Sequence, residues 1–148
     1  MVEHAAKALR NFDRHGRRKG ISIELRRDKE TVRVLAESRS LLCCLENLIS
    51  NAIKFSPWHS TITMDVCSNS RSGVFRIEDH GPGISAAETA LLFRKFTRLS
   101  ARPTGGEGST GMGLHIVHEL VGAMGGAVVY EPGENGGARF IIELPLAG

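Results

Sequence analysis

Asn47, Asn51 and Lys54 recur at i, i+4 and i+7 in the stretch ENLISNAIKFS, Glu46 to Ser56. At about 100° per residue, this spacing gathers the three side chains within roughly a 60° sector of a helix. Asparagine oxygens are neutral, hard ligands of the kind that Mg²⁺ accepts beside phosphate oxygens, and a lysine adds a point charge for phosphates. The alternative is a solvated polar face, which these three residues alone do not exclude.

A carboxylate stands before a glycine-rich turn in DHGPGI, Asp79 to Ile84. Asp79 ends the alternating run Val74 to Glu78, which predicts a strand, and the Gly-Pro-Gly that follows predicts a tight turn. Glycines let a planar ligand approach the backbone, and an ionised carboxylate accepts a hydrogen bond from an exocyclic amine such as adenine N6. Such a turn is usually only a turn, but together with the amide helix it predicts an ATP pocket.

A third candidate segment is rich in glycine, Ser109 to Gly113, and precedes an apolar run that begins at Leu114. Helix N-termini present unpaired N–H groups and a partial positive charge, so this segment predicts an anion site. Gly106 to Gly111 also fits the G-x-G-x-x-G fingerprint of dinucleotide sites, with Glu131 about 20 residues further on. That fingerprint must directly follow a strand, whereas Leu99 to Gly108 has loop composition, so the dinucleotide interpretation is disfavoured.

Taken in order, these segments resemble the sequence boxes of the ATP-binding catalytic domain of bacterial sensor histidine kinases, whose superfamily includes gyrase, heat-shock chaperone and mismatch-repair ATPases. The asparagine box matches Glu46 to Ser56, and the first glycine box matches Asp79 to Ile84. The phenylalanine box matches Phe93 to Phe96, and the second glycine box matches Ser109 to Leu114. The resemblance extends from about Gly20 to Leu146. It implies an α/β fold, a two-layer sandwich of a mixed β-sheet packed on helices, the Bergerat-type ATP-binding fold.

The resemblance also implies a role for each matching residue. Asn51 matches the Mg²⁺-coordinating asparagine, Asn47 the polar residue one turn earlier, and Lys54 a basic residue that contacts phosphate. Phe55 matches an aromatic residue that packs on the base, and Asp79 matches the aspartate that reads adenine.

Further implied contacts surround the base and the phosphates. Arg98 falls where many family members place an arginine that approaches the γ-phosphate, so Asn47, Lys54 and Arg98 are the expected catalytic residues. The other expected nucleotide-binding residues are Gly81, Gly83, Ile84, Phe96, Thr110, Gly111, Met112, Gly113 and Leu114.

The segment from Thr97 to Thr110 has no apolar periodicity, contains glycines and a proline, and has the length of a functional loop. We predict that residues 97–110 form an ATP lid, which would bring Arg98 and the glycine amides onto the triphosphate. Phe93 and Phe96 would anchor its base. These two phenylalanines could also be core residues, and the two roles are compatible.

Periodicity and turn signals predict the elements that position these segments. Residues 1–19 are expected to form an N-terminal helix, clearest over Val2 to Arg14, and Ser38 is expected to cap the amide helix. The predicted apolar face of the amide helix comprises Leu41, Leu45, Leu48, Ile49 and Ala52. The predicted strands are Ile21 to Leu25, Thr31 to Leu35, Thr61 to Cys67, Val74 to Glu78, Ala127 to Tyr130 and Ala138 to Leu144, the last two joined as a hairpin. Two further helices are expected, from Ser85 to Phe96 and from Met112 to Met124.

Composition limits the class of protein. The 148 residues are 41% hydrophobic, with no run long enough to span a membrane and no signal peptide. A single intracellular domain in the cytoplasm is therefore expected, either on its own or as the cytoplasmic part of a larger, membrane-bound sensor. Residues 1–40 hold 11 Lys or Arg and 6 Asp or Glu. Because acids are interleaved and aromatic residues are few, a solvated or partner-facing surface is favoured over nucleic-acid binding.

Cysteine and histidine residues indicate no further site. Cys43, Cys44 and Cys67 provide no disulfide framework, so buried thiols in a reducing compartment are expected. His115 and His118 could form half of a metal site, but no nearby set of carboxylates and cysteines completes it.

The resemblance therefore implies a domain that binds Mg²⁺-ATP and transfers the γ-phosphoryl group to a histidine in two-component signalling. Gyrase-type and chaperone-type relatives carry a water-activating glutamate where this chain has Asn47, and an amide cannot accept a proton at neutral pH. Glu46 is adjacent but lies about 100° around the helix. A serine kinase or anti-sigma regulator, in which that glutamate is also expected, and an ATP-binding module without turnover are the alternatives.

None of the six histidines has a context resembling His-Glu-x-x-x-Pro, the phosphoacceptor motif of the family; His4, for example, is followed by two alanines. We therefore expect an excised catalytic domain, monomeric in isolation, that meets a histidine-bearing dimerisation domain in cis or in trans. A response regulator would act downstream. The domain itself is expected to contact neither membrane nor nucleic acid.

Overall fold

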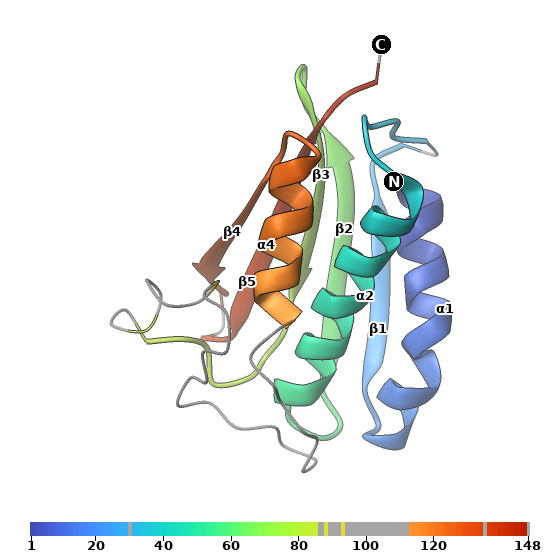
Figure 1. Cartoon of the computed structure of the whole chain (residues 1–148). Coiled ribbons are helices and arrows are strands. Elements are labelled where there is room, and N and C mark those ends of the chain that lie inside the picture. Colours follow the sequence, from blue (N-terminus) through green and yellow to red (C-terminus); the bar gives the residue numbers. More distant parts are fainter. Residues whose placement is uncertain (30, 86–87, 89–92, 94–112, 135, 148) are drawn as a thin grey trace.

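Helix α2, Ser38–Phe55, lies at the centre of a helical layer that covers one face of the sheet (Figure 1). Helix α1, Val2–Arg18, packs along one side of α2, and helix α4, Gly113–Ala123, packs along the other. The computed structural model describes residues 1–29, 31–85, 88, 93, 113–134 and 136–147. Because α2 is held on both flanks, packing sets its rotation about its own axis.

The sheet contains five strands in the order β1-β2-β3-β5-β4. They are β1, Ser22–Arg27; β2, Thr61–Ser68; β3, Ser72–Glu78; β4, Ala127–Pro132; and β5, Ala138–Pro145. β1 and β2 are parallel, whereas β2 with β3, β3 with β5 and β4 with β5 are antiparallel. The predicted α/β sandwich with a mixed sheet, and its closing hairpin, are confirmed.

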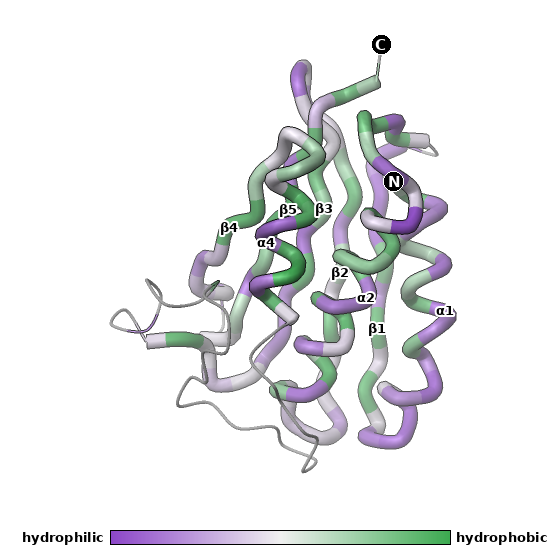
Figure 2. Tube along the Cα trace, viewed as in Figure 1, coloured by the Kyte–Doolittle hydropathy of each residue, from purple (hydrophilic) through white to green (hydrophobic). Residues whose placement is uncertain are grey.

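The core fills the space between the sheet and the helices. The predicted apolar face of α2 is buried, with at most 3% of each side chain exposed: Leu41, Leu45, Leu48, Ile49 and Ala52. Alternate residues of β2 and β3 meet it from the sheet: Ile62, Met64, Val66, Phe75 and Ile77. Figure 2 shows this division as alternating hydrophobic and hydrophilic bands along α1 and α2. Each large aliphatic side chain buried here contributes about 1.5–3 kcal/mol, which fixes the face that α2 turns inward.

The predicted strand Thr31 to Leu35 is wrong. Val34 forms one isolated antiparallel bridge with Leu146, and the amide of Leu35 donates to the carbonyl of Pro145, but the segment does not join the sheet. Val32 is buried, which explains the alternating pattern. The carbonyl of Val32 accepts a hydrogen bond of 2.8 Å from the amino terminus of Met1, so its hydrogen-bonding capacity is met without a neighbouring strand.

The N-cap of α2 is Glu37 and not Ser38. A carboxylate oxygen of Glu37 accepts a 2.6 Å hydrogen bond from the amide of Ser40, and this bond lowers the pKa of Glu37. Ser38 is already helical, and its hydroxyl lies 2.8 Å from His4 Nε2. A carboxylate supplies both an acceptor and a negative charge to the positive end of the helix, which serine preference alone did not anticipate.

Helices α1 and α4 can be compared with their predicted ranges, whereas the helix predicted from Ser85 to Phe96 cannot. α1 continues to Arg18, four residues beyond the clearest periodicity, and α4 agrees closely with its predicted range. The predicted helix from Ser85 to Phe96 and the lid at 97–110 lie almost wholly outside the described residues. At the start of that helix, the amide of Glu88 donates to the hydroxyl of Ser85 at 3.3 Å, as at an N-cap. Among the helices in the described ranges, none has both the length and the apolar character that a bilayer crossing requires.

The three thiols have different environments. Cys44 is buried, Cys67 is half-buried and Cys43 is exposed, so the prediction of three buried thiols is wrong for Cys43. Burial raises the pKa of the Cys44 thiol to about 12, which makes it an unreactive packing residue.

Gly122 in α4 and Gly126 just before β4 allow a matched test of how closely the turn after α4 packs against β5. We expect Gly126→Ala to lower the free energy of unfolding by about 1–3 kcal/mol, because a Cβ there would overlap the carbonyl oxygen of Glu143. Gly122→Ala should raise it by about 0.5–1 kcal/mol, because nothing lies within 4 Å of the added atom. Urea unfolding measures both, and equal effects of the two substitutions would contradict this packing.

Candidate functional site

The polar face of α2 is partly covered and is not simply solvated. Asn47, Asn51, Lys54 and Phe55 are all half-buried, while the opposite face of the helix is buried in the core. Their helical spacing puts the four predicted residues on one stripe of α2, away from the stripe that faces the core. Partial burial of two amides and an ammonium restricts their rotamers, which favours a binding surface over a freely hydrated one.

The amide nitrogen of Asn47 is hydrogen-bonded within α2, and its amide oxygen lies near the start of α4. Its Nδ2 donates to the carbonyl oxygen of Cys43 at 2.9 Å, one helical turn earlier. Its Oδ1 lies 3.3 Å from the position that a Cβ on Gly113 would occupy. The structure thus brings the predicted asparagine box and the start of α4 together, with an amide oxygen between them.

Asp79 is the predicted adenine-reading residue, and it is 5% exposed at the end of β3. Its Oδ1 accepts hydrogen bonds from the amide of Gly81 at 2.9 Å and from the amide of Ala138 at 3.1 Å. Neither bond uses Oδ2. Burial raises the pKa of the Asp79 carboxyl, and the two amide donors partly oppose that rise by stabilising its ionised form.

The first glycine box brings the end of α2 close to Asp79. A Cβ on Gly81 would overlap the carbonyl oxygen of Phe55, the last residue of α2. Gly83 has a φ of 72°, a left-handed conformation that favours glycine. The amide of Ile84 donates to the hydroxyl oxygen of Tyr130 at 3.2 Å. The turn is therefore held against both α2 and β4, and the predicted base-binding residues share one region.

Three contributors to this region were not predicted as site residues. Ala138 supplies an amide to Asp79, Tyr130 holds Ile84, and a Cβ on Gly137 would overlap the carbonyl oxygen of Asp79. Gly137 lies between the two strands that the sequence predicted as a hairpin, and no further role was predicted for it. Its close approach to Asp79 depends on the pairing of β3 with β5, which periodicity does not reveal.

The second glycine box and the lid can be followed only in part. Gly113 begins α4 beside Asn47, and the side chain of Leu114 packs against the core. Five predicted residues lie outside the described residues: Phe96, Arg98, Thr110, Gly111 and Met112. Their roles stay predictions.

Phe93 connects the phenylalanine box to α4. Its ring stacks on His118 with centroids 5.4 Å apart and meets the edge of Phe140 at 6.4 Å. His115 Nδ1 donates to the carbonyl of Phe93 at 3.2 Å. The two histidines thus contact Phe93, and within the described ranges no three His, Cys, Asp or Glu residues are grouped to hold a metal ion.

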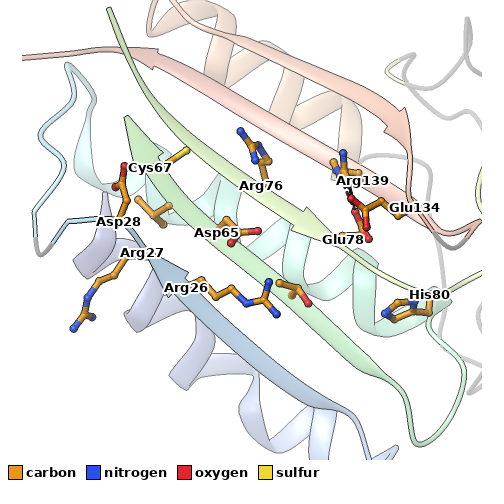
Figure 3. Close-up of a pocket in the computed structure, with 12 residues that line it drawn as sticks. Arg26, Arg27, Asp28, Asp65, Cys67, Arg76, Glu78, His80, Glu134 and Arg139 are labelled. Atoms are coloured by element: carbon orange, nitrogen blue, oxygen red, sulfur yellow. Dashed lines mark hydrogen bonds and ion pairs between the residues drawn. The ribbon is translucent and has the colours of Figure 1, made fainter. Parts of the chain in front are cut away.

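A groove of about 700 Å³ lies on the face of the sheet opposite the helices (Figure 3). Arg26, Asp65 and Arg76 stand opposite one another on β1, β2 and β3, and Arg139 on β5 is bonded to Glu78 at 2.6 Å. Positive and negative side chains alternate along its floor. None of the predicted nucleotide-binding residues that the structure describes lines this groove, which carries four basic and four acidic side chains and is therefore a charge-balanced surface.

Comparisons with known proteins bear on the region around α2 and Asp79. Residues 36–148 match the family described as "Histidine kinase-, DNA gyrase B-, and HSP90-like ATPase". The chain is 37% identical over 102 residues to the Sensor protein RstB of Escherichia coli (strain K12). That alignment covers 69% of this chain and 23% of the relative, so the chain spans about a quarter of its length.

Two solved structures extend the similarity to the whole fold. The mycobacterial sensor histidine kinase MprB superposes with a TM-score of 0.83 at 27% identity, covering 99% of this chain and 95% of that chain. Full-length ShkA in complex with AMPPNP superposes with a TM-score of 0.84 at 28% identity, covering 99% of this chain and 30% of that chain.

The burial of Asp79 predicts a pH dependence of stability. Folding raises the pKa of the Asp79 carboxyl above its ordinary value of 3.8. As the pH rises above about 3.8, the unfolded state therefore loses this proton first, while the folded state still retains it. Stability contributed by this group therefore falls with increasing pH through that window. We expect Asp79→Asn to remove this loss, so its urea midpoint should gain on that of the wild type as the pH rises above about 3.8 and through the raised pKa of Asp79 in the folded state.

Asp65→Asn is the matched control, since it removes one carboxylate from the open face of the sheet. An Asp79→Asn variant that loses stability relative to the wild type as the pH rises would contradict the desolvation of this carboxylate.

Proposed function

The chain belongs to the family of histidine kinase-, DNA gyrase B- and HSP90-like ATPases, and from this premise we propose that it binds Mg²⁺-ATP as the catalytic domain of a sensor histidine kinase. Its reaction would transfer the γ-phosphoryl group to a histidine imidazole. The bond between the γ-phosphorus and the β–γ bridging oxygen breaks, a phosphorus–nitrogen bond forms, and ADP leaves.

The observation that carries the proposal is the burial and hydrogen bonding of the Asp79 carboxylate. A carboxylate that is 5% exposed, with Oδ1 already accepting from two backbone amides, keeps Oδ2 as an acceptor in a low-dielectric position. The exocyclic amine of adenine is a donor that fits this acceptor. AMPPNP, bound in full-length ShkA, carries the same base, and this supports an adenine nucleotide as the ligand.

The half-buried face of α2 would meet the phosphates. We assign Lys54 to a phosphate oxygen, Phe55 to the base, and Asn51, with Asn47 one turn away, to the metal end of the nucleotide. The donor set fits Mg²⁺, because an asparagine oxygen is a hard, neutral ligand and phosphates supply the remaining charge. Bound Mg²⁺ would neutralise charge on the β- and γ-phosphates. Each assigned residue lies on one helix whose rotation is set by the core.

The start of α4 would complete the phosphate side. Gly113 lies beside Asn47, and the N-terminal end of α4 offers N–H groups to anions. Arg98 would approach the γ-phosphate from a lid at 97–110, and Phe96 would anchor that lid. The remaining proposed nucleotide contacts are Gly81, Gly83, Ile84, Thr110, Gly111, Met112 and Leu114.

Asn47 distinguishes phosphoryl transfer from hydrolysis. A water-activating group at this position would need to accept a proton, and the Asn47 amide instead donates to the Cys43 carbonyl. The histidine on the acceptor supplies its own nucleophile. No observation favours a serine kinase, an anti-sigma regulator or a module without turnover, the alternatives that the sequence left open.

The proposed partners follow from the reaction. A histidine-bearing dimerisation domain would dock in cis or in trans, and a response regulator would take the phosphoryl group from it. These steps would take place in the cytoplasm, where ATP is available.

Calorimetric titration of ADP and AMPPNP, with and without Mg²⁺, tests the nucleotide site. The wild type should bind in the micromolar to sub-millimolar range. Asp79→Asn should lower affinity at least about tenfold, because its amide can present an N–H instead of an acceptor to adenine N6. Asp65→Asn, on the open face of the sheet, should bind as the wild type does. Equal affinity of the wild type and Asp79→Asn would place the base elsewhere.

Asn51→Ala tests the metal end of the same site. We expect it to remove most of the gain in AMPPNP affinity that Mg²⁺ provides and to leave Mg²⁺-free ADP binding within about twofold, because the amide oxygen contacts only the metal. An unchanged Mg²⁺ effect would argue against Asn51 as a ligand. Supplying a dimerisation hairpin in trans with labelled ATP should then yield acid-labile, alkali-stable phosphohistidine on the hairpin.

A further inference from the structure

Lys19 is a buried cation that the proposed function does not use. Only 4% of the residue is exposed, although it follows the last turn of α1 in a markedly basic stretch whose other members are exposed. A lysine is rarely buried unless its ammonium group is hydrogen-bonded. The contacts of Lys19 therefore indicate why it is held inside the structure.

The ammonium group of Lys19 binds the last turn of α2. Its Nζ donates to the carbonyl oxygen of Ile53 at 2.7 Å and to that of Lys54 at 3.3 Å. The carbonyl oxygen of Lys19 accepts from the amide of His59 at 2.8 Å. Lys19 thus ties the end of α1 to the end of α2 and to the loop that follows α2, at the same end of the helical layer (Figure 1).

A cation is well suited to this position. The last four carbonyl groups of a helix have no partner within the helix, and they form the negative end of the helix dipole. A buried ammonium group satisfies two of these carbonyls at once with charge-assisted hydrogen bonds, which are stronger than neutral ones. The geometry of the final turn is therefore set by a side chain from another element.

That final turn carries residues of the proposed nucleotide site. Lys54 is one of the two residues whose carbonyl Lys19 binds, and its side chain is half-buried on the polar face of α2. On the other side of the turn, the Phe55 carbonyl lies against Gly81. The backbone of Lys54 is therefore held between these contacts, which fixes the point from which its side chain extends.

We propose that Lys19 is a positioning residue of the nucleotide site, which holds the last turn of α2 so that Lys54 meets the phosphates. The inference rests on the proposed function, because it assigns Lys54 to a phosphate oxygen. Lys19 does not touch the nucleotide. Its effect is confined to ligands that carry phosphates, because Phe55, which we assign to the base, is held separately by the contact of its carbonyl with Gly81.

A double-mutant cycle with ADP tests this proposal. Lys19→Met removes the charge and the donors while keeping a long apolar side chain, and should weaken ADP binding about fivefold to tenfold. In a Lys54→Ala background the same substitution should change ADP affinity less than twofold, because the group that it positions is gone. Adenosine, which has no phosphates, should bind Lys19→Met within twofold of the wild type.

Lys29→Met is the matched control, since Lys29 is exposed and its Nζ bonds only the hydroxyl of Ser68 among the contacts that the structure describes. It should bind ADP as the wild type does. All titrations are made at a temperature where urea unfolding shows each variant to be more than about 95% folded. If Lys19→Met does not fold, Lys19→Gln, which keeps donors without the charge, enters the same cycle with the same expectations.

The outcomes distinguish a failure of the role of Lys19 from a failure of the proposed nucleotide site. If the wild type binds ADP and the Lys19 variant binds it equally well, or if the two substitutions are additive, Lys19 is only a structural anchor and the inference fails. Equal losses for ADP and adenosine would overturn it in the same way. If the wild type binds no nucleotide, the proposed function itself fails and the inference with it.

Discussion

The junction of β3 and β5 at Asp79 and Ala138 is the contact on which the candidate site depends. The amide of Asp79 donates to the carbonyl of Ala138, and the amide of Ala138 donates back to Asp79 Oδ1, so the side chain completes the ladder at the strand end. A buried carboxylate loses hydration, and backbone N–H groups replace part of it. The orientation of the second carboxylate oxygen follows from this arrangement, because both donors approach the first.

Glycines determine how closely the neighbouring elements approach that junction. Gly81 accommodates the last carbonyl of α2, and Gly137 accommodates the carbonyl of Asp79; a Cβ at either position would overlap backbone. Backbone cannot move aside as the end of a flexible side chain can. These contacts therefore join the end of α2, which carries the proposed phosphate-binding lysine, to the strand end that carries the proposed base-binding carboxylate.

Charge alone does not distinguish a functional surface in this protein. On the open face of the sheet, Arg139 bonds to Glu78 at 2.6 Å and to Glu131 at 2.9 Å, and this local compensation accounts for much of its polarity. On α2, by contrast, the amides are half-buried along a helix whose opposite face is core. Half-buried polar side chains on α2 are partly desolvated and favour contact with a polar ligand, whereas charged side chains on the open face of the sheet largely compensate one another.

The sequence alone was sufficient to predict the elements in which apolar residues recur at regular spacing over many residues, because that spacing reflects burial. The inward face of α2, the closing hairpin and the mixed α/β sandwich were predicted correctly, because apolar side chains at helical or alternating spacing must face a common core. The order of the sequence boxes predicted that Asn47, Asn51 and Asp79 belong to one site, and this assignment stays a prediction. The structure shows the proximity of the segments that carry them, with Gly81 against Phe55 and Gly113 beside Asn47.

Interactions between distant segments were decided only by the tertiary structure. Residues 31–35 have the alternating pattern of a strand, yet the carbonyl of Val32 accepts a hydrogen bond from the amino terminus and not from a neighbouring strand. The N-cap of α2 is a glutamate, which N-cap preferences rank below serine. Ala138 and Lys19 carry no local sign of their roles, since one contributes a backbone amide and the other a side chain that reaches across to another helix. Local patterns determine which surfaces of an element are apolar, but the partner of a buried polar group depends on which elements packing brings next to it.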